Sequence, residues 1–431
     1  MRDVPTGVVA FRHRSHGKPS VDDDGGDGMK AVVWHGTGDI RLDEVPDPKI
    51  LEPSDAIVRI TRSAICGTDL HLVRGTMPGM VEGTVLGHEA VGVIEEVGPA
   101  VRGFTPGDRV VVTSTIGCGT CSYCRAGYYA QCDTANPNGP SAGTSFFGGP
   151  ETTGPVDGLQ AEYARVPFAM TTLVRIPDAV SDDQAILLSD IFPTAWFGAR
   201  LAEVRKGDSV LVLGAGVVGQ FAIASAKRQG AGRVFVVDGI ASRLDKAREQ
   251  NAETVDFTRE DPVALVKELT GGIGVDRVIE AVGVDAQRPG TGPAAEQAEQ
   301  QADRFDQERR QAAPDANPSG DRWVPGDAPS QALRWAVRAV AKAGSIGIIG
   351  VYPPGFGSFP IGEAMNKNLT VKMGNCNHRR YLPELLDTVV SDTVDPTAFI
   401  TRHEDPVDAV EAYESFDRRE EGWLKTVLDV A

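Results

Sequence analysis

The sequence predicts an α/β protein in which an irregular β-barrel-like domain is combined with a doubly wound parallel-sheet domain. From Met29 to about residue 185, short β patterns alternate with Gly/Pro turns, which is typical of an irregular barrel. Over 187–365, apolar strands alternate with helical stretches, which indicates βαβ units and a parallel sheet. The tail, 366–431, returns to mixed patterns and most simply completes the first domain.

The predicted organisation has a leader, two domains and an insertion. Residues 1–28 are polar and rich in Gly and Asp, so we expect a disordered leader. The barrel-like domain takes 29–186 and 366–431, and the parallel-sheet domain takes 187–365. Residues from about 285 to 330 are nearly free of large apolar side chains. We interpret them as a surface insertion, with a subunit-contact arm or a lid as the alternative.

Charge and composition limit the classes of partner. The chain carries 43 Lys and Arg against 60 Asp and Glu, a net charge of −17, whereas a nucleic-acid binder needs cations to contact phosphates. The longest apolar stretch, Val210 to Ala226, is broken by three glycines and Gln220 and fits a strand, turn and helix better than a membrane span. No apolar block of signal-peptide length opens the chain. We expect a cytoplasmic protein with a small-molecule partner, without nucleic acid or membrane.

Four of the six cysteines lie within fifteen residues. In a chain that nothing marks for export, such a cluster suggests metal binding before disulfides. Zinc takes four thiolates in a tetrahedron, and four ligands leave no open position, so we predict a structural zinc site. An iron–sulfur cluster is the main alternative, and unrelated buried cysteines are a weaker one. The predicted ligands are Cys118, Cys121, Cys124 and Cys132.

A cysteine, a histidine and nearby acids occur upstream of this loop. Cys66 begins CGTDLH (66–71), and His88 follows twenty-two residues later in GHEAVGVIEEVG (87–98). A catalytic zinc needs about three protein ligands and a vacancy for substrate, and this spacing is compatible with such a site. The alternative is that His88 is an ordinary core histidine whose ring nitrogens are hydrogen-bonded within the protein.

A glycine turn follows an apolar strand in VLVLGAGVVG (210–219). Its glycines permit close backbone approach, and the following helix N-terminus can receive a pyrophosphate. Asp238 ends the next strand, where an acid binds ribose hydroxyls and repels a 2′-phosphate, so we predict a Rossmann domain that prefers NAD to NADP. Arg243 could instead hold that phosphate or flank the adenine. The predicted cofactor-binding residues are Gly214, Gly216, Val217, Val218, Gly219, Asp238 and Arg243.

Together and in this order, these motifs resemble the zinc-containing medium-chain alcohol dehydrogenases. The resemblance rests on GHE-x2-G-x5-G-x2-V (87–101), the CGTDxH segment and the four-cysteine loop, and it covers the chain from about Met29 onward. It implies a GroES-like catalytic domain, a Rossmann domain, NAD(H), and two zinc ions per chain, one catalytic and one structural. We also expect a homo-oligomer, either a dimer or a tetramer.

The resemblance assigns roles to the residues around the predicted catalytic zinc. Cys66 and His88 match the first two ligands. Asp69 matches the carboxylate that orients the ligand histidine through its other ring nitrogen. Glu89 matches the adjacent acid, which can approach the metal during ligand exchange.

The sequence departs from the family at two positions. Many members have a cysteine as the third ligand, whereas Asp190 in SDIFPT (189–194) resembles the formaldehyde-dehydrogenase-like branch. A carboxylate preserves the formal charge of the site, but an aspartate here could instead be a helix N-cap. Gly67 stands where some relatives carry a basic residue that contacts the cofactor pyrophosphate, so that contact must be absent or supplied elsewhere.

The expected function is zinc-dependent hydride transfer between NAD(H) and an alcohol or aldehyde, as in formaldehyde dehydrogenases. By resemblance, Thr68 hydrogen-bonds the substrate oxygen and His71 is the outer end of the proton relay. A formaldehyde dismutase-like enzyme with tightly held NAD is the main alternative. A zinc-free quinone or enoyl reductase would lack Cys66 and His88, and a zinc-ribbon interaction protein would lack the cofactor turn.

The candidate residues of the substrate pocket are a cysteine and several aromatic residues. We interpret Cys376, in MGNCNH, as a packing residue, with a place near the cofactor as the alternative. Aromatic residues are candidate pocket walls, although core packing is their commoner role; they are Phe146, Phe147, Phe192, Trp196 and Tyr352.

Overall fold

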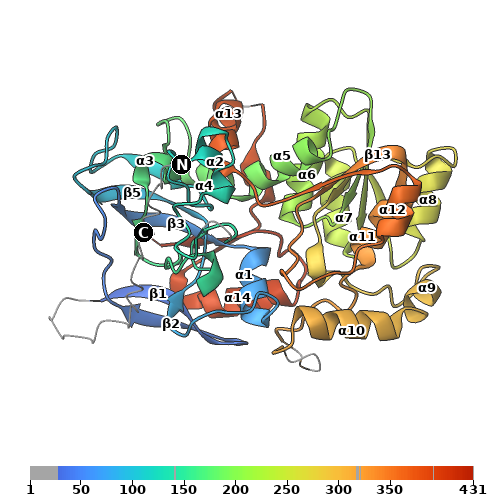
Figure 1. The fold of residues 1–431 in the computed structure, drawn as a ribbon, viewed down its shortest axis with the longest axis horizontal. Coiled ribbons are helices and arrows are strands. Elements are labelled where there is room, and N and C mark those ends of the chain that lie inside the picture. The colour runs from blue at the N-terminus through green and yellow to red at the C-terminus, as the bar shows by residue number, and fades with distance from the viewer. Residues whose placement is uncertain (1–27, 140–141, 317–319, 321, 392, 431) are drawn as a thin grey trace, which may run out of the picture.

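The computed structural model describes residues 28–139, 142–316, 320, 322–391 and 393–430 (Figure 1). The predicted leader lies outside these residues, apart from Gly28. None of the helices in the described ranges has the length and hydropathy needed to cross a bilayer.

Two sheets form the barrel-like part of the molecule. A seven-stranded sheet has the order β15-β16-β3-β5-β6-β8, with β7 paired to β3, and a three-stranded sheet has the order β2-β1-β4. β16, near the end of the described chain, pairs antiparallel with β3, so residues 56–65 and 426–429 share one sheet. The strands are β1 (Met29–Gly36), β2 (Asp39–Val45), β3 (Ala56–Ile65), β4 (Thr84–Val85), β5 (Ala90–Val97), β6 (Arg109–Val112), β7 (Tyr163–Val166), β8 (Leu173–Arg175), β15 (Arg402–Glu404) and β16 (Thr426–Asp429).

Six parallel strands form the other sheet, in the order β11-β10-β9-β12-β13-β14. Their near-continuous apolar runs suit strands that are covered by helices on both faces. The strand order reverses between β9 and β12, and ligands of such sheets bind outside the carboxyl ends of the strands at this point. The two parts together confirm the predicted fold class. The strands are β9 (Ser209–Leu213), β10 (Arg233–Asp238), β11 (Glu253–Asp256), β12 (Val275–Glu280), β13 (Val340–Ile348) and β14 (Thr370–Met373).

The α-helices lie around these sheets, mostly on the parallel one (Figure 1). Those of the barrel-like part and its junction are α1 (Gly67–Arg74), α2 (Ser122–Arg125), α3 (Ala169–Thr172), α4 (Asp182–Ser189), α13 (His378–Val390) and α14 (Ala409–Asp417). The others are α5 (Ile191–Leu201), α6 (Val217–Arg228), α7 (Ala241–Glu249), α8 (Pro262–Leu269), α9 (Ala295–Glu299), α10 (Ala302–Ala312), α11 (Gln331–Ala339) and α12 (Ile361–Asn366).

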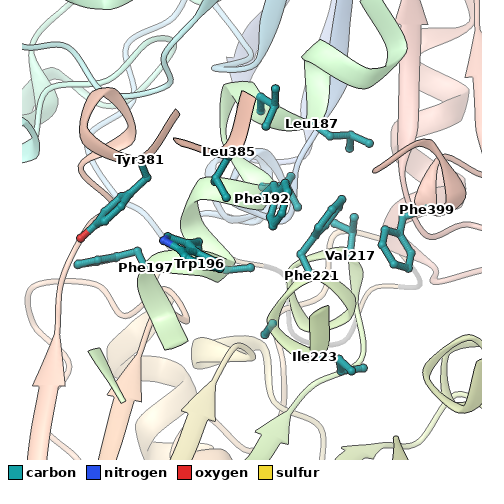
Figure 2. Packing of buried hydrophobic residues seen from close by; sticks show 14 of the residues in the cluster. Leu187, Phe192, Trp196, Phe197, Val217, Phe221, Ile223, Tyr381, Leu385 and Phe399 are labelled. Carbon is teal, nitrogen blue, oxygen red and sulfur yellow. The ribbon is translucent and has the colours of Figure 1, made fainter. Parts of the chain in front are cut away.

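Aromatic packing fixes the start of α5 against α6 and α13 (Figure 2). The rings of Phe192 and Phe221 stack with centroids 4.8 Å apart, and Phe399 meets Phe221 edge-on at 4.7 Å. On the other side of α5, Phe197 lies 5.9 Å from Tyr381 of α13. Such pairs contribute about 0.5–1.5 kcal/mol each beyond their buried area. The junction between the two parts is therefore a densely packed apolar core.

The segment predicted as an insertion contains α9 and α10 and a small apolar cluster of its own, in which Phe305 packs on Ala298 and Ala328. It also contacts the barrel-like part. Arg322 forms an ion pair with Glu414 of α14, and the Trp323 backbone N–H donates to Asp417 Oδ2 at 2.8 Å. The segment therefore links the parallel sheet to α14.

A buried ion-pair cluster joins the two parts near this segment. Arg74, at the end of α1, donates from Nε to Asp417 Oδ1 at 2.7 Å and forms a second ion pair with Asp285. Its side chain is 4% exposed, so the charge depends on these carboxylates for compensation.

Arg74→Met is expected to lower the free energy of unfolding by about 3–5 kcal/mol, because it leaves two buried carboxylates without their cation. Denaturant unfolding checks this value. The matched control is Arg41→Met, which removes a solvent-exposed pair with Asp39 and should leave the free energy of unfolding nearly unchanged. Equal small losses in both variants would contradict the role given to Arg74.

Candidate active site

A cavity of about 780 Å³ lies between the barrel-like part and the carboxyl ends of the parallel strands. Its walls include Cys66, His88 and Asp190 on one side and the glycine turn with Asp238 on the other. The volume is in the range of small-molecule and cofactor sites. The cavity therefore brings together the predicted metal ligands and the predicted cofactor residues.

The predicted catalytic ligands converge at this cavity. One ligand atom each from Cys66, His88, Glu89 and Asp190 lies within 4.8 Å of all the others. Asp190 Oδ2 is 3.6 Å from Cys66 Sγ and 3.5 Å from His88 Nε2. A thiol, an imidazole nitrogen and a carboxylate oxygen are the donor types that zinc prefers. The donor set fits the ion that the sequence predicts here.

Local backbone geometry explains why Cys66 and His88 face each other. Cys66 is the N-cap of α1, and its N–H donates to Asp69 Oδ2 at 2.9 Å in a capping box. Gly87 has a φ of +91°, and a Cβ there would lie 2.4 Å from the Gln160 side chain. Only glycine fits that turn, which directs His88 into the site. Asp69 Oδ1 lies 3.1 Å from His88 Nδ1, close enough for the predicted orienting role to be tested by substitution.

Asp190 lies at the break between α4 and α5 and does not cap α5 through its side chain. Its Oδ1 accepts hydrogen bonds from Thr194 Oγ1 at 2.8 Å and from His378 Nε2 at 2.7 Å. Although burial opposes it, the hydrogen bonds from His378 and His88 hold the pKa of Asp190 well below its usual value. The geometry therefore favours a charged carboxylate that serves the cavity over the N-cap alternative.

Glu89 is engaged by a lysine that the sequence did not single out. Lys425 is fully buried and donates from Nζ to Glu89 Oε1 at 2.6 Å and to the Ile65 carbonyl at 3.2 Å. Burial raises the pKa of Glu89 to about 7, and Lys425 partly offsets this effect. In the sequence Lys425 is a single lysine among mostly apolar residues, and nothing local shows that it is buried or that it meets Glu89. Its charge compensates only one of the buried acids beside Cys66.

The two predicted relay residues, Thr68 and His71, lie about one turn apart on α1, and both line the cavity. His71 Nδ1 is 2.9 Å from Thr76 Oγ1, which itself donates to the His71 carbonyl. Because the Thr76 hydroxyl proton is already donated to that carbonyl, Thr76 Oγ1 can only accept from His71. Nδ1 of His71 therefore carries the ring proton, and Nε2 is free to accept one. Burial lowers the pKa of His71, partly offset by Asp285, which favours the neutral ring. Thr68 reaches the cavity three residues earlier.

The four cysteines of the predicted structural site also meet, with all four sulfurs within 4.8 Å of one another. All are free thiols, and backbone N–H groups point at the sulfurs, for example from Cys124 to Cys121 at 3.4 Å and from Ala135 to Cys132 at 3.3 Å. Such donors favour the thiolate form, although at Cys132 burial outweighs them and raises the pKa of the thiol. Although partial burial opposes it, a hydrogen bond from Thr120 helps to lower the pKa of Cys118 to about 6. A closed shell of four thiolates fits a structural zinc ion.

The glycine turn joins β9 to α6 as the sequence predicts. Gly214 has a φ of +88°, and a Cβ at Gly219 would lie 2.0 Å from the Gly214 carbonyl oxygen. Asp238, at the end of β10, accepts the Ala215 N–H at 2.7 Å, which ties the two strand ends together. Arg243 lines the cavity beside this turn, as do Gly216, Val217 and Val218.

The candidate pocket aromatics separate into two groups. Phe146 and Tyr352 line the cavity, and the Phe146 ring lies edge-on to His88 with centroids 6.1 Å apart. The interpretation as pocket walls does not hold for the others, which pack in buried clusters: Phe147, Phe192 and Trp196. Cys376 is 4% exposed; it packs in the core and also borders the cavity.

His378 is the functional candidate that sequence reasoning missed. It begins α13, contacts Asp190 and lines the cavity. The chain has seven histidines, and this one follows directly after MGNCN, where only the cysteine attracted attention. Its long separation from Asp190 left no local pattern to reveal the contact.

Comparison with known proteins gives consistent matches. Residues 52–178 match the alcohol dehydrogenase GroES-like domain, and residues 217–289 match the zinc-binding dehydrogenase model. An uncharacterized zinc-type alcohol dehydrogenase-like protein of Bacillus subtilis is 36% identical over 404 residues, 93% of this chain and 100% of that protein. A glutathione-independent formaldehyde dehydrogenase of Pseudomonas aeruginosa is 37% identical over 276 residues, 61% of this chain and 67% of that protein. The structure of an alcohol dehydrogenase from Thermus sp. ATN1 is 32% identical, with a TM-score of 0.75 over 93% of this chain and 99% of that one.

Asp190→Asn is expected to release one of two zinc ions per chain during mild chelation, while the four-thiolate zinc stays bound. The neutral amide binds zinc more weakly than the negatively charged carboxylate, although it would cap a helix about as well. Elemental analysis before and after chelation gives the stoichiometry. Asp178→Asn, at an exposed position twelve residues earlier, is the control and should keep both ions. Retention of two ions by Asp190→Asn would contradict the assignment and point to Glu89 as the third ligand.

Proposed function

The chain belongs to the zinc-type medium-chain alcohol dehydrogenase family, and from this premise we propose that it transfers hydride between NAD and a small alcohol or aldehyde, as formaldehyde dehydrogenases do. It is a zinc-type alcohol dehydrogenase-like oxidoreductase that uses zinc and a nicotinamide cofactor. One observation carries the proposal: Cys66, His88 and Asp190 converge on the same cavity as the glycine turn and Asp238.

In this proposal Cys66, His88 and Asp190 hold the catalytic zinc, and the four cysteines hold the structural one. When bound, the catalytic zinc supplies a Lewis acid at the substrate oxygen and NAD supplies the hydride acceptor. Asp69 keeps the His88 ring in place through Nδ1. Lys425 holds Glu89 at the edge of the ligand set, where it balances one buried negative charge.

The chain's own residues provide the path for the proton. In this proposal Thr68 accepts the proton of the substrate hydroxyl, and His71, one turn further along α1, is the next acceptor on the cavity wall; a bound NAD would supply the ribose hydroxyls that could connect the two. His71 Nε2 accepts it because Nδ1 already carries a proton and is held by Thr76 and Asp285. An aldehyde enters the same chemistry as its hydrate, which has the hydroxyl that Thr68 requires.

The finer assignment to a small, polar substrate rests on polar side chains in the cavity wall, among them Thr194, which donates to Asp190 Oδ1. Several hydroxyl and amide side chains line the cavity, and Asn375 donates to Thr144 Oγ1 at 2.6 Å. These groups suit a hydrate or a small alcohol better than a long apolar chain. The similarity to the Pseudomonas protein named as a glutathione-independent formaldehyde dehydrogenase supports the same class.

Arg419 supplies the cation for the cofactor pyrophosphate that Gly67 cannot provide. Arg419 lines the cavity, donates to the Asp285 carbonyl at 3.1 Å, and forms no ion pair among the described residues. Burial and repulsion from Arg74 and Arg243 lower the pKa of Arg419 to about 10. A bound pyrophosphate would relieve that repulsion, because it brings negative charge to a cluster of arginines.

NADH formation from formaldehyde, primary alcohols, polyols and threonine tests the function directly. We expect turnover of a small alcohol or aldehyde, with NAD preferred to NADP because Asp238 repels a 2′-phosphate. Thr68→Ala should abolish turnover with both zinc ions retained, whereas Thr105→Ala, at an exposed position, should not. No NADH from any substrate would refute the proposal; alcohol and acid formed together from aldehyde without free NADH would identify a dismutase instead.

Arg419→Met is expected to weaken binding of NADH and of ADP by about 10- to 100-fold, the equivalent of a charge-assisted hydrogen bond of about 1.5–3 kcal/mol. Adenosine, which lacks the pyrophosphate, should bind the variant as it binds the wild type. Fluorescence titration gives the dissociation constants. Arg418→Met is the control, since that neighbour is exposed and pairs with Glu420. A loss for adenosine equal to that for ADP would contradict a pyrophosphate contact.

A further inference from the structure

The two carboxylate oxygens of Asp190 have different surroundings. Oδ2 faces Cys66 Sγ at 3.6 Å and His88 Nε2 at 3.5 Å. Oδ1 points the other way and accepts hydrogen bonds from His378 Nε2 at 2.7 Å and Thr194 Oγ1 at 2.8 Å. A carboxylate oxygen has about two lone-pair sites, so these two donors saturate Oδ1. Only Oδ2 is free to serve the cluster of predicted ligands.

His378 is held in place by contacts other than the one to Asp190. Its other ring nitrogen, Nδ1, lies 3.0 Å from Thr115 Oγ1, and its side chain is 3% exposed. It begins α13, and that helix packs against α5 through Tyr381 and Leu385, as Figure 2 shows. A carboxylate only accepts hydrogen bonds, so Nε2 must be the donor toward Asp190 whichever way Nδ1 is engaged. The ring position therefore does not depend on Asp190 alone.

We propose that His378, assisted by Thr194, is a positioning residue that makes Asp190 a ligand through one oxygen only. This inference rests on the proposed function, in which Asp190 holds the catalytic zinc. A thiolate offers one donor atom, but a carboxylate offers two and can bind a metal through both. Binding through both oxygens would fill the position that a catalytic zinc must leave open for substrate. His378 removes that second donor and so compensates for the exchange of cysteine for aspartate.

The test replaces the zinc of the open site with cobalt(II) in the full-length protein, while the four-thiolate zinc remains. Four-coordinate cobalt(II) absorbs visible light much more strongly than five- or six-coordinate cobalt(II), so the spectrum reports the number of ligands directly. In His378→Phe, which keeps a ring of similar size but removes the donor, we expect cobalt to stay bound and the visible band to weaken. KM for the substrate should rise, and kcat/KM should fall about 10- to 100-fold.

Two further variants keep the result interpretable. His378→Gln, whose amide N–H can donate to Oδ1, should restore part of the band. Thr194→Val removes the other donor at a different position and should weaken the band in the same direction, which covers the case in which His378→Phe does not fold. His403→Phe is the control, because His403 is 40% exposed and pairs with Asp429 instead of Asp190. The cobalt spectrum of this variant should match that of the wild type.

An unchanged spectrum and an unchanged KM in both folded variants would overturn the inference, since His378 would then be only a packing residue. Loss of cobalt from folded His378→Phe would also overturn it, because Asp190 would then need His378 to bind at all. A wild-type protein that takes up no cobalt at the open site would refute the proposed function itself.

Discussion

The buried meeting of a thiol, an imidazole and carboxylates is the constraint on which the rest of the molecule depends. Cys66, His88, Glu89 and Asp190 bring ligand atoms within 4.8 Å of one another. Buried charges of one sign are costly unless a counter-charge lies beside them. Lys425 balances Glu89, whereas the basic neighbours of Asp190 among the described residues are two histidines, His88 and His378, rather than a lysine or arginine. A divalent cation supplies what this cluster needs.

The fold holds this cluster from several sides. The capping box of α1 positions Cys66, a left-handed glycine turns the chain at His88, and the break between α4 and α5 presents Asp190. The aromatic core beneath α5 joins these elements to α13 and to the first helix of the parallel sheet (Figure 2). The glycine turn of that sheet opens into the same cavity, so donor and acceptor of a hydride can meet there.

Local sequence patterns predicted much of this arrangement. The glycine turn, the alternating βαβ pattern and the four-cysteine loop each depend on residues close in sequence, and the structure places them as expected. Lys425 and His378 could not be found in this way, because their partners are distant in sequence. Lys425 lies 336 residues after Glu89, and His378 lies 188 residues after Asp190. The aromatics show a second limit: hydrophobic pattern marks Phe146 and Phe192 alike, yet only Phe146 lines the cavity. Which face of a packed element borders a cavity is decided by tertiary contacts.

Anomalous X-ray scattering at the zinc absorption edge, from crystals of the protein purified with zinc, tests the central claim most directly. Two peaks per chain are expected, one enclosed by the four cysteine sulfurs and one between Cys66 Sγ, His88 Nε2 and Asp190 Oδ2. A single peak at the four-cysteine loop, or a second peak bound by Glu89 with Asp190 turned away, would contradict it.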